Sequence, residues 1–361
     1  MNKKTISTAG AFAVWVMGSG FATGQEILQF LTSYGYKSFI LVAITLIGFL
    51  LVGAGILEAG QENRDLAGFS HFEYFCGKKA GVFYTWFLPV SMFAAMIILI
   101  SGAGSTLEEY YGINHYIGAL MMALMAFAAY VIGFQRFVKA ASYIGTIMIA
   151  FTVFVGLVTV IRDFDTLRCV NEYSDLLAKK QPVSGWWLSG LLYISYNMCG
   201  GSKYYTALGA ESESKRQARM GAIVGAIALV VAILLMNTAM LTDIEKTAVL
   251  DIPTLYLAKK ISPVLGAGFS IILILGIFSS CSAMLWTVCD KFVAQGSKKS
   301  YIVAACVSIA AFLIGLLPFA QLVGKVYSVL GYIGLIFITC VIIKKIRVKR
   351  KNRTLRSGTE L

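Results

Sequence analysis

Long apolar segments alternate with short polar ones along nearly the whole chain. A helix needs about 20 mostly apolar residues to cross a bilayer, and ten segments reach that length. Only helices or closed barrels satisfy every backbone group in lipid, and apolar runs this continuous predict helices. The expected spans cover residues 9–31, 37–58, 82–104, 114–134, 141–161, 185–209, 218–241, 263–289, 300–318 and 321–343. The pattern therefore predicts an all-α polytopic membrane protein.

The polar segments predict the orientation of the chain. Placing the N-terminus in the cytoplasm assigns most of the 31 lysines and arginines to the inside, as the positive-inside rule requires. Both termini are then cytoplasmic. The start, "MNKKTISTAGAFAVWV", imitates a signal peptide, but apolar character continues to Phe30 and favours a retained first helix. Outside, we expect residues 162–184 to fold over the outer face and residues 242–262 to form a bent amphipathic element around Pro253.

Composition supports this class and excludes others. Of the 361 residues, 58% are hydrophobic and 14% are charged, whereas a soluble protein carries about 25% charge. The net charge of +13 lies in short loops and in the tail "KKIRVKRKNRTLR", which indicates contact with anionic lipid rather than nucleic acid. Seven scattered cysteines and two isolated histidines show no metal-ligand or disulfide spacing. No cofactor is expected.

The first and sixth spans are interrupted near their middle. The first reads "VMGSGFATGQEILQF" over residues 16–30, and the sixth contains "YNMCGGSKYY" over residues 196–205. Glycines weaken helices, although Gly20 and Gly24 also form a small-x-x-x-small motif that lets helices pack closely. Gly20 and Gly200 lie about half of the 361-residue chain apart. Matched interruptions in two halves of opposite topology indicate a secondary transporter.

The motif "GSGFATGQEILQF" resembles the YkvI-type family of bacterial membrane proteins. More distantly, the ten spans resemble the amino acid–polyamine–organocation superfamily, whose LeuT-like fold is a 5+5 inverted repeat with helices 1 and 6 discontinuous. This resemblance implies a bacterial plasma membrane location. It divides the chain into a first repeat at 1–161, an outer loop at 162–184, an inverted second repeat at 185–343 and a basic cytoplasmic tail at 344–361.

The resemblance also implies binding residues. An amino-acid zwitterion would lie between the two breaks, at Ser19, Gly20, Thr23, Ser195, Asn197, Gly200 and Gly201. A sodium ion would take oxygen ligands from the first and eighth spans, at Val14, Met17, Gly276, Ser279 and Ser280. Equally, the serines of the eighth span could bond back to their own helix. The third span has no mid-depth tyrosine to bind a carboxylate, which departs from sodium-coupled amino-acid carriers.

Two ionisable residues lie within these spans. Glu26 is six residues beyond Gly20, about 9 Å towards the outside along a helix. It could line the outer pathway, attract a cation or carry a proton. Lys203, just past the sixth-span break, could replace a sodium ion electrostatically, and each residue could instead bond to the broken backbone. Tyr193 or Tyr196 could gate the solute.

These features predict a secondary active transporter of a small polar or zwitterionic solute, an amino acid or related amine. Transport would proceed by alternating access and be coupled to Na⁺ or H⁺. A membrane receptor or sensor that keeps the fold but does not transport is the alternative. An enzyme is disfavoured because no catalytic constellation recurs at one membrane depth, and a channel because no filter-like repeat occurs.

Overall fold

The computed structural model describes residues 3–66, 68–133, 138–294 and 296–357, with side chains except at 19, 138–143, 349 and 351–357. These residues form helices, and no strand occurs among them. The first half contains α1 (Lys3–Val16), α2 (Ser19–Thr23), α3 (Gln25–Phe30), α4 (Lys37–Gly48), α5 (Ala54–Glu62), α6 (His71–Tyr111), α7 (His115–Ile132) and α8 (Val138–Asp163). The second contains α9 (Ser174–Ala178), α10 (Trp186–Gly200), α11 (Ser202–Ala210), α12 (Lys215–Leu241), α13 (Ile244–Thr247), α14 (Pro253–Ile261), α15 (Pro263–Asp290), α16 (Lys298–Ile314) and α17 (Phe319–Ser357).

Seven helical stretches in the described ranges are long and apolar enough to cross a membrane. They are Lys37–Glu62, His71–Tyr111, His115–Ile132, Ile144–Ala178, Lys215–Leu241, Pro263–Asp290 and Phe319–Val348. The other three expected spans fall short for visible reasons. The first and sixth are divided into shorter helices, and α16 has only 17 residues. The multi-pass helical architecture is confirmed.

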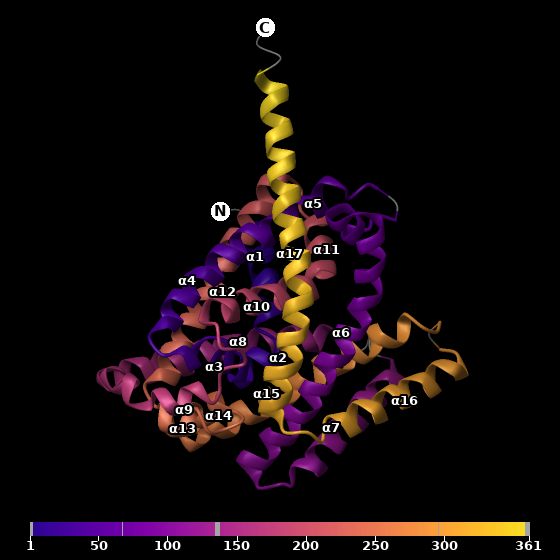
Figure 1. Cartoon of the computed structure of the whole chain (residues 1–361). Helices are drawn as coiled ribbons and strands as arrows, with labels where there is room; N and C mark the ends of the chain where they lie inside the picture. The colour runs from indigo at the N-terminus through magenta and orange to yellow at the C-terminus, as the bar shows by residue number, and fades with distance from the viewer. Residues whose placement is uncertain (1–2, 67, 134–137, 295, 358–361) are drawn as a thin grey trace.

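Some helices extend well beyond the apolar core that predicted them. The third expected span, at 82–104, belongs to α6, which covers His71–Tyr111. The last expected span belongs to α17, which continues through the basic tail to Ser357. Figure 1 shows α17 projecting from the end of the bundle at which both termini lie. A hydropathy pattern detects the apolar part of a helix that crosses the lipid. Polar turns at either end of the helix add nothing to this apolar run, so the pattern does not predict them.

The broken helices occupy the interior of the bundle. The first piece, α1, packs against α12, while α10 packs against α17 and α4. The long helices α6 and α15 contact each other along much of their lengths. Large side chains from these elements are fully buried, including Phe12, Phe30, Tyr193 and Phe337. The piece that follows the first-span glycines is fully enclosed, because every residue of α3 is buried.

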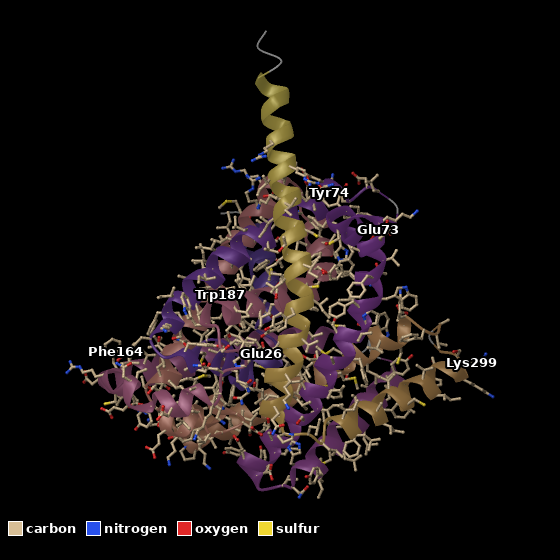
Figure 2. The ribbon with its side chains drawn as sticks, viewed as in Figure 1. Glu26, Glu73, Tyr74, Phe164, Trp187 and Lys299 are labelled. Carbon is tan, nitrogen blue, oxygen red and sulfur yellow. The ribbon has the colours of Figure 1, made fainter. Side chains whose placement is uncertain are left out.

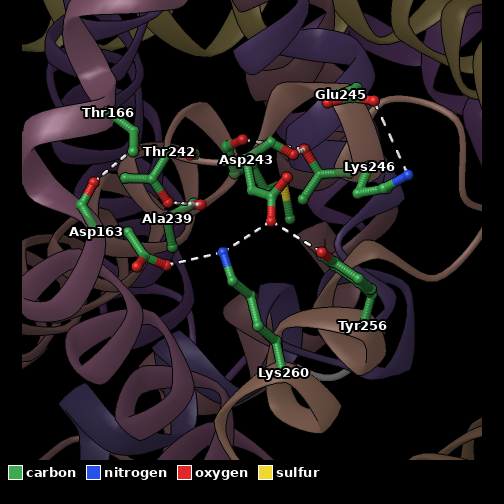
Figure 3. Close-up of polar contacts among 11 residues, drawn as sticks. Asp163, Thr166, Ala239, Thr242, Asp243, Glu245, Lys246, Tyr256 and Lys260 are labelled. Carbon is green, nitrogen blue, oxygen red and sulfur yellow. Dashed lines mark hydrogen bonds and ion pairs between the residues drawn. The ribbon is translucent and has the colours of Figure 1, made fainter.

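The two long loops fold against the opposite end of the bundle from the termini (Figure 1). Residues 242–262 form α13 and α14, and α14 begins at Pro253, as the sequence indicates. An ionic network holds α14 in place (Figure 3). The Lys260 ammonium contacts Asp163 at 2.9 Å and Asp243 at 2.8 Å.

Tyr256 completes this network, because its hydroxyl donates to Asp243 at 2.9 Å. Burial, and then the neighbouring Asp243 carboxylate, raise the pKa of Tyr256 to about 12. The phenol therefore keeps its proton and acts as a donor at neutral pH. Asp163 ends α8 and Asp243 follows α12, so one lysine joins α14 to the ends of two long helices.

Replacing Lys260 with glutamine should loosen α14. The two carboxylates lose their shared cation, and because Lys260 keeps 38% side-chain exposure the effect should be modest, about 1 kcal/mol. Hydrogen exchange of the α14 amides should accelerate about fivefold. Lys246→Gln is the matched control, since Lys246 only meets Glu245 at 3.9 Å on an exposed surface. Equal exchange in the two variants would show that the network does not fasten α14.

Candidate functional site

The first helix is broken at two glycines. After α1 ends at Val16, Gly18 is extended, with φ −67° and ψ −169°, and the five-residue α2 follows. Gly24 then adopts the left-handed conformation, with φ 85° and ψ −15°, before α3 begins. Glycine reaches that region at little cost, whereas other residues are strained there. The interruption predicted in the first span is confirmed.

The turn at Gly24 brings Glu26 back onto Gly20. A Cβ atom on Gly20 would collide with the Oε1 atom of Glu26. The carboxylate therefore lies against the break. The expected rise of about 9 Å concerns the backbone along the helix axis, and the glutamate side chain reaches back over part of it. Figure 2 shows Glu26 near the middle of the bundle.

Two tyrosines hold the Glu26 carboxylate. Tyr196 on α10 donates its hydroxyl to Oε2 at 2.6 Å, and the Tyr327 hydroxyl on α17 lies beside the same carboxylate. The two phenol rings stack with centroids 4.6 Å apart and planes 4° apart. Glu26 is only 5% exposed and forms no ion pair with any described residue. Neutral donors alone satisfy this buried acid within the protein.

Tyr196 was predicted to lie near the site, but Tyr327 was missed. The sequence indicates that most tyrosines anchor the membrane interface. Tyr327, however, lies inside the expected span at 321–343 rather than at its end. That position was the available signal, because a phenol buried within a span needs a polar partner.

The sixth span is interrupted much less than the first. Gly201 has φ −79° and ψ −5°, close to helical values. Its N–H bonds to Asn197 at 3.0 Å, and its carbonyl accepts from Tyr205 at 2.8 Å. The irregularity between α10 and α11 is therefore a single residue. The expected unwinding, which would free several backbone groups, is absent from this part of the described structure.

A cavity of about 450 Å³ lies at the break. It is lined by α1, α2, α3, α6, α8, α10, α15 and α17, with Tyr204 of α11. Many residues selected from the sequence line it, namely Val14, Gly20, Glu26, Tyr196, Asn197, Gly200, Gly276, Ser279 and Ser280. The structure thus brings residues from distant parts of the chain around one space of the size that small-molecule sites have.

Other selected residues lie outside this lining. Thr23 donates to the Gly20 carbonyl at 2.6 Å, and Ser195 donates to the Gly331 carbonyl at 2.7 Å, so both bind backbone. Met17, Tyr193 and Gly201 are buried but do not line the cavity. Lys203 is exposed on α11 and forms no ion pair with Glu26. The side chain of Ser19 falls outside the described part of the structure.

The serines of α15 divide into two kinds. Ser282 donates to the Phe278 carbonyl at 2.7 Å, which is the back-bonding arrangement. Ser279 and Ser280 face the cavity, and neither hydroxyl bonds to another described residue. These two hydroxyls remain available to a ligand or ion.

The fold is that of a membrane transporter. Two solved structures of a manganese transporter from Eremococcus coleocola, both of mutants, match it with a TM-score of 0.51 and 14% sequence identity. Each match covers 92% of this chain and 76% of the transporter. At that identity the likeness concerns the fold alone.

In sequence, the chain is similar to the uncharacterized membrane protein YkvI of Bacillus subtilis (strain 168). The two are 22% identical over 330 residues, which cover 91% of this chain and 93% of YkvI. The uncharacterized protein YyaD of the same organism is 18% identical over 336 residues, 93% of this chain and 95% of YyaD. A scan against known protein families finds no match. The resemblance to YkvI expected from the first-span motif is confirmed.

Gly20→Ala should disturb the site, because the added methyl displaces the Glu26 carboxylate from its tyrosines. A buried group that loses its partner costs about 1–3 kcal/mol, so the melting temperature of the purified protein should fall by several degrees. Gly18→Ala is the matched control, since its Cβ would meet only the Trp15 carbonyl oxygen at 3.6 Å. Equal melting temperatures for the two variants would contradict the close approach.

Proposed function

We propose that the protein is a secondary active transporter of a small polar or zwitterionic solute, such as an amino acid or a related amine. The observation that carries the proposal is the cavity at the broken first helix, with the buried Glu26 carboxylate on its wall. A buried ionisable group in a membrane protein is costly and marks a functional pathway. The transporter fold supports the same conclusion.

The packing of the helices supports a 5+5 inverted repeat. α1 packs against α12, and the sixth-span pieces α10 and α11 pack against α4 and α5. In an inverted repeat these are equivalent pairs, the first and seventh helices and the sixth and second. The proposed repeats are residues 1–161 and 185–343, with an outer loop at 162–184 and a basic tail at 344–361.

One-sided access to the cavity supports alternating access. Gly145 near the start of α8 and Thr287 near the end of α15 line it, and both lie in the predicted cytoplasmic halves of their helices. On the other side of Glu26, the side chains of Thr23, Gln25 and Tyr193 are fully buried. This arrangement corresponds to an inward-facing state in a bacterial plasma membrane with both termini cytoplasmic.

The closed side contains polar atoms that would gain from opening. Both amide atoms of Gln25 and the hydroxyls of Tyr193 and Thr254 are buried without a hydrogen-bond partner among the described residues. Each such group costs about 1–3 kcal/mol. Water entering from the outside would satisfy them, so the closed outer side is poised to open.

Transport would be driven by Na⁺ or H⁺. Sodium would bind the Ser279 and Ser280 hydroxyls with backbone carbonyls of Val14, Met17 and Gly276, and a proton would travel on Glu26. In the alternative, a receptor would bind the same solute without moving it. Because the solved structure of similar fold is a manganese transporter, Mn²⁺ is also included among the solutes to be tested.

Uptake into proteoliposomes separates these functions. The purified protein should accumulate at least one radiolabelled solute from a panel of amino acids, amines and Mn²⁺ when an inward Na⁺ or H⁺ gradient is imposed. Protein-free liposomes and ionophore-treated proteoliposomes are the controls. Saturable binding with no flux under any gradient would assign the chain to the receptor class instead.

If sodium drives transport, Ser279→Ala combined with Ser280→Ala should abolish Na⁺-dependent uptake. The loss of two oxygen ligands should lower the affinity for Na⁺ at least about tenfold, because the affinity of a site for a hard cation depends on the number of its ligands. The matched control is Ser282→Ala on the same helix, whose hydroxyl already bonds to Phe278. Sodium dependence that is unchanged in the double variant would exclude this ion site.

A further inference from the structure

The cavity contains one acidic side chain and no basic one among the described residues. Among the described residues that line it, Glu26 is the only acidic one, and there is no lysine, arginine or histidine. Asn197, Ser91, Ser279, Ser280 and Thr287 supply neutral polar groups. Any countercharge for Glu26 must therefore come from what enters the cavity.

The Glu26 carboxylate retains room for a cation. A carboxylate has about four acceptor positions, and the two tyrosine hydroxyls occupy part of this capacity. Glu26 lines the cavity, so a solute that enters it meets this carboxylate. An ammonium group, with its three N–H donors, matches this arrangement and forms the stronger, charge-assisted kind of hydrogen bond.

The aromatic and methionine side chains that line the cavity favour a cation that carries an apolar organic group. The rings of Trp15, Phe87, Tyr196, Tyr204 and Tyr327 line the cavity. Aromatic faces attract ammonium groups through their quadrupole and also cover apolar surface. Met92, Met148 and Met284 add flexible apolar contacts.

A bare metal ion and an anion fit less well. Hard divalent cations such as Mg²⁺ and Ca²⁺ take about six or more ligands, and no group of three His, Cys, Asp or Glu side chains suited to a metal occurs in the described ranges. A solute carboxylate would enter the cavity without a positive partner, and burying an unpaired charge is expensive. The space of about 450 Å³ also far exceeds a single ion.

We propose that this cavity selects organic monocations, namely primary amines with an apolar body and no free carboxylate, through Glu26 and the surrounding aromatic rings. The proposal rests on the transporter function above and narrows its solute. Glu26 pairs with the ammonium, while Trp15, Tyr204 and the methionines contact the body.

Matched triplets of probes test this selectivity. The purified full-length protein is melted with phenethylamine, phenylalanine or phenylpropionate, with isopentylamine, leucine or isocaproate, and with tryptamine, tryptophan or indolepropionate. Each triplet shares one body and differs only in charge. At least one amine should raise the melting temperature. Its affinity should be at least about tenfold higher than that of the amino acid with the same body. The anions should leave the melting temperature unchanged.

Substitutions assign the effect to the cavity. Glu26→Gln keeps the size of the side chain and should lower the affinity for the stabilising amine at least about tenfold. Glu62→Gln is the matched control, because Glu62 pairs with Lys215 outside the cavity and should leave amine binding unchanged. The melting temperature of each variant without ligand shows that it is folded.

Three results would overturn the proposal: no amine stabilises the protein, a zwitterion or anion binds better than its matched amine, or Glu26→Gln retains full amine binding. Different results would overturn the proposed transporter function. Amine binding without flux would remove transport and leave this selectivity, whereas gradient-driven uptake of an anion would remove the selectivity and leave transport.

Discussion

The contact between the Glu26 carboxylate and the Cα atom of Gly20 is the constraint on which the rest of the site depends. Only glycine leaves space for that oxygen, and the left-handed Gly24 separates α2 from α3, which carries Glu26 in its first turn. Once buried, the carboxylate needs donors, and it finds them on α10 and α17. One acidic side chain thereby connects the broken first helix to the sixth and the last spans.

This connection explains how binding could be linked to movement in the proposed transporter. Glu26 lies between the open cavity and the buried side occupied by Gln25 and Tyr193. A cation that neutralises Glu26 lowers the cost of enclosing the site, whereas an empty site leaves an acid with neutral donors alone. A ligand shifts a conformational equilibrium only through such a difference in affinity between states. At the end of the bundle away from the termini, Lys260 and its two aspartates hold α14.

The sequence predicts the architecture well because membrane spans follow from apolar length alone. It also locates the break at Gly18, Gly20 and Gly24, since glycine content is a local property. About half of the cavity lining on α1, α10 and α15 follows from the resemblance to known carriers. The return of Glu26 onto Gly20 could not be predicted, because it depends on one backbone torsion at Gly24. The role of Tyr327 depends on which helix packs beside α10, which is a tertiary fact. The sixth-span glycines do not unwind the helix as their sequence predicts, since Gly201 stays nearly helical when its neighbours supply hydrogen bonds.

The most direct test of the account is a cryo-electron microscopy structure of the protein with the solute that stabilises it most strongly. The account predicts solute density inside the cavity, with a nitrogen within hydrogen-bonding distance of the Glu26 carboxylate and the body against Trp15 and Tyr204. Glu26 should still lie over Gly20 and accept from Tyr196. Density outside the cavity, or a solute bound there without contact to Glu26, would contradict the central role given to this carboxylate.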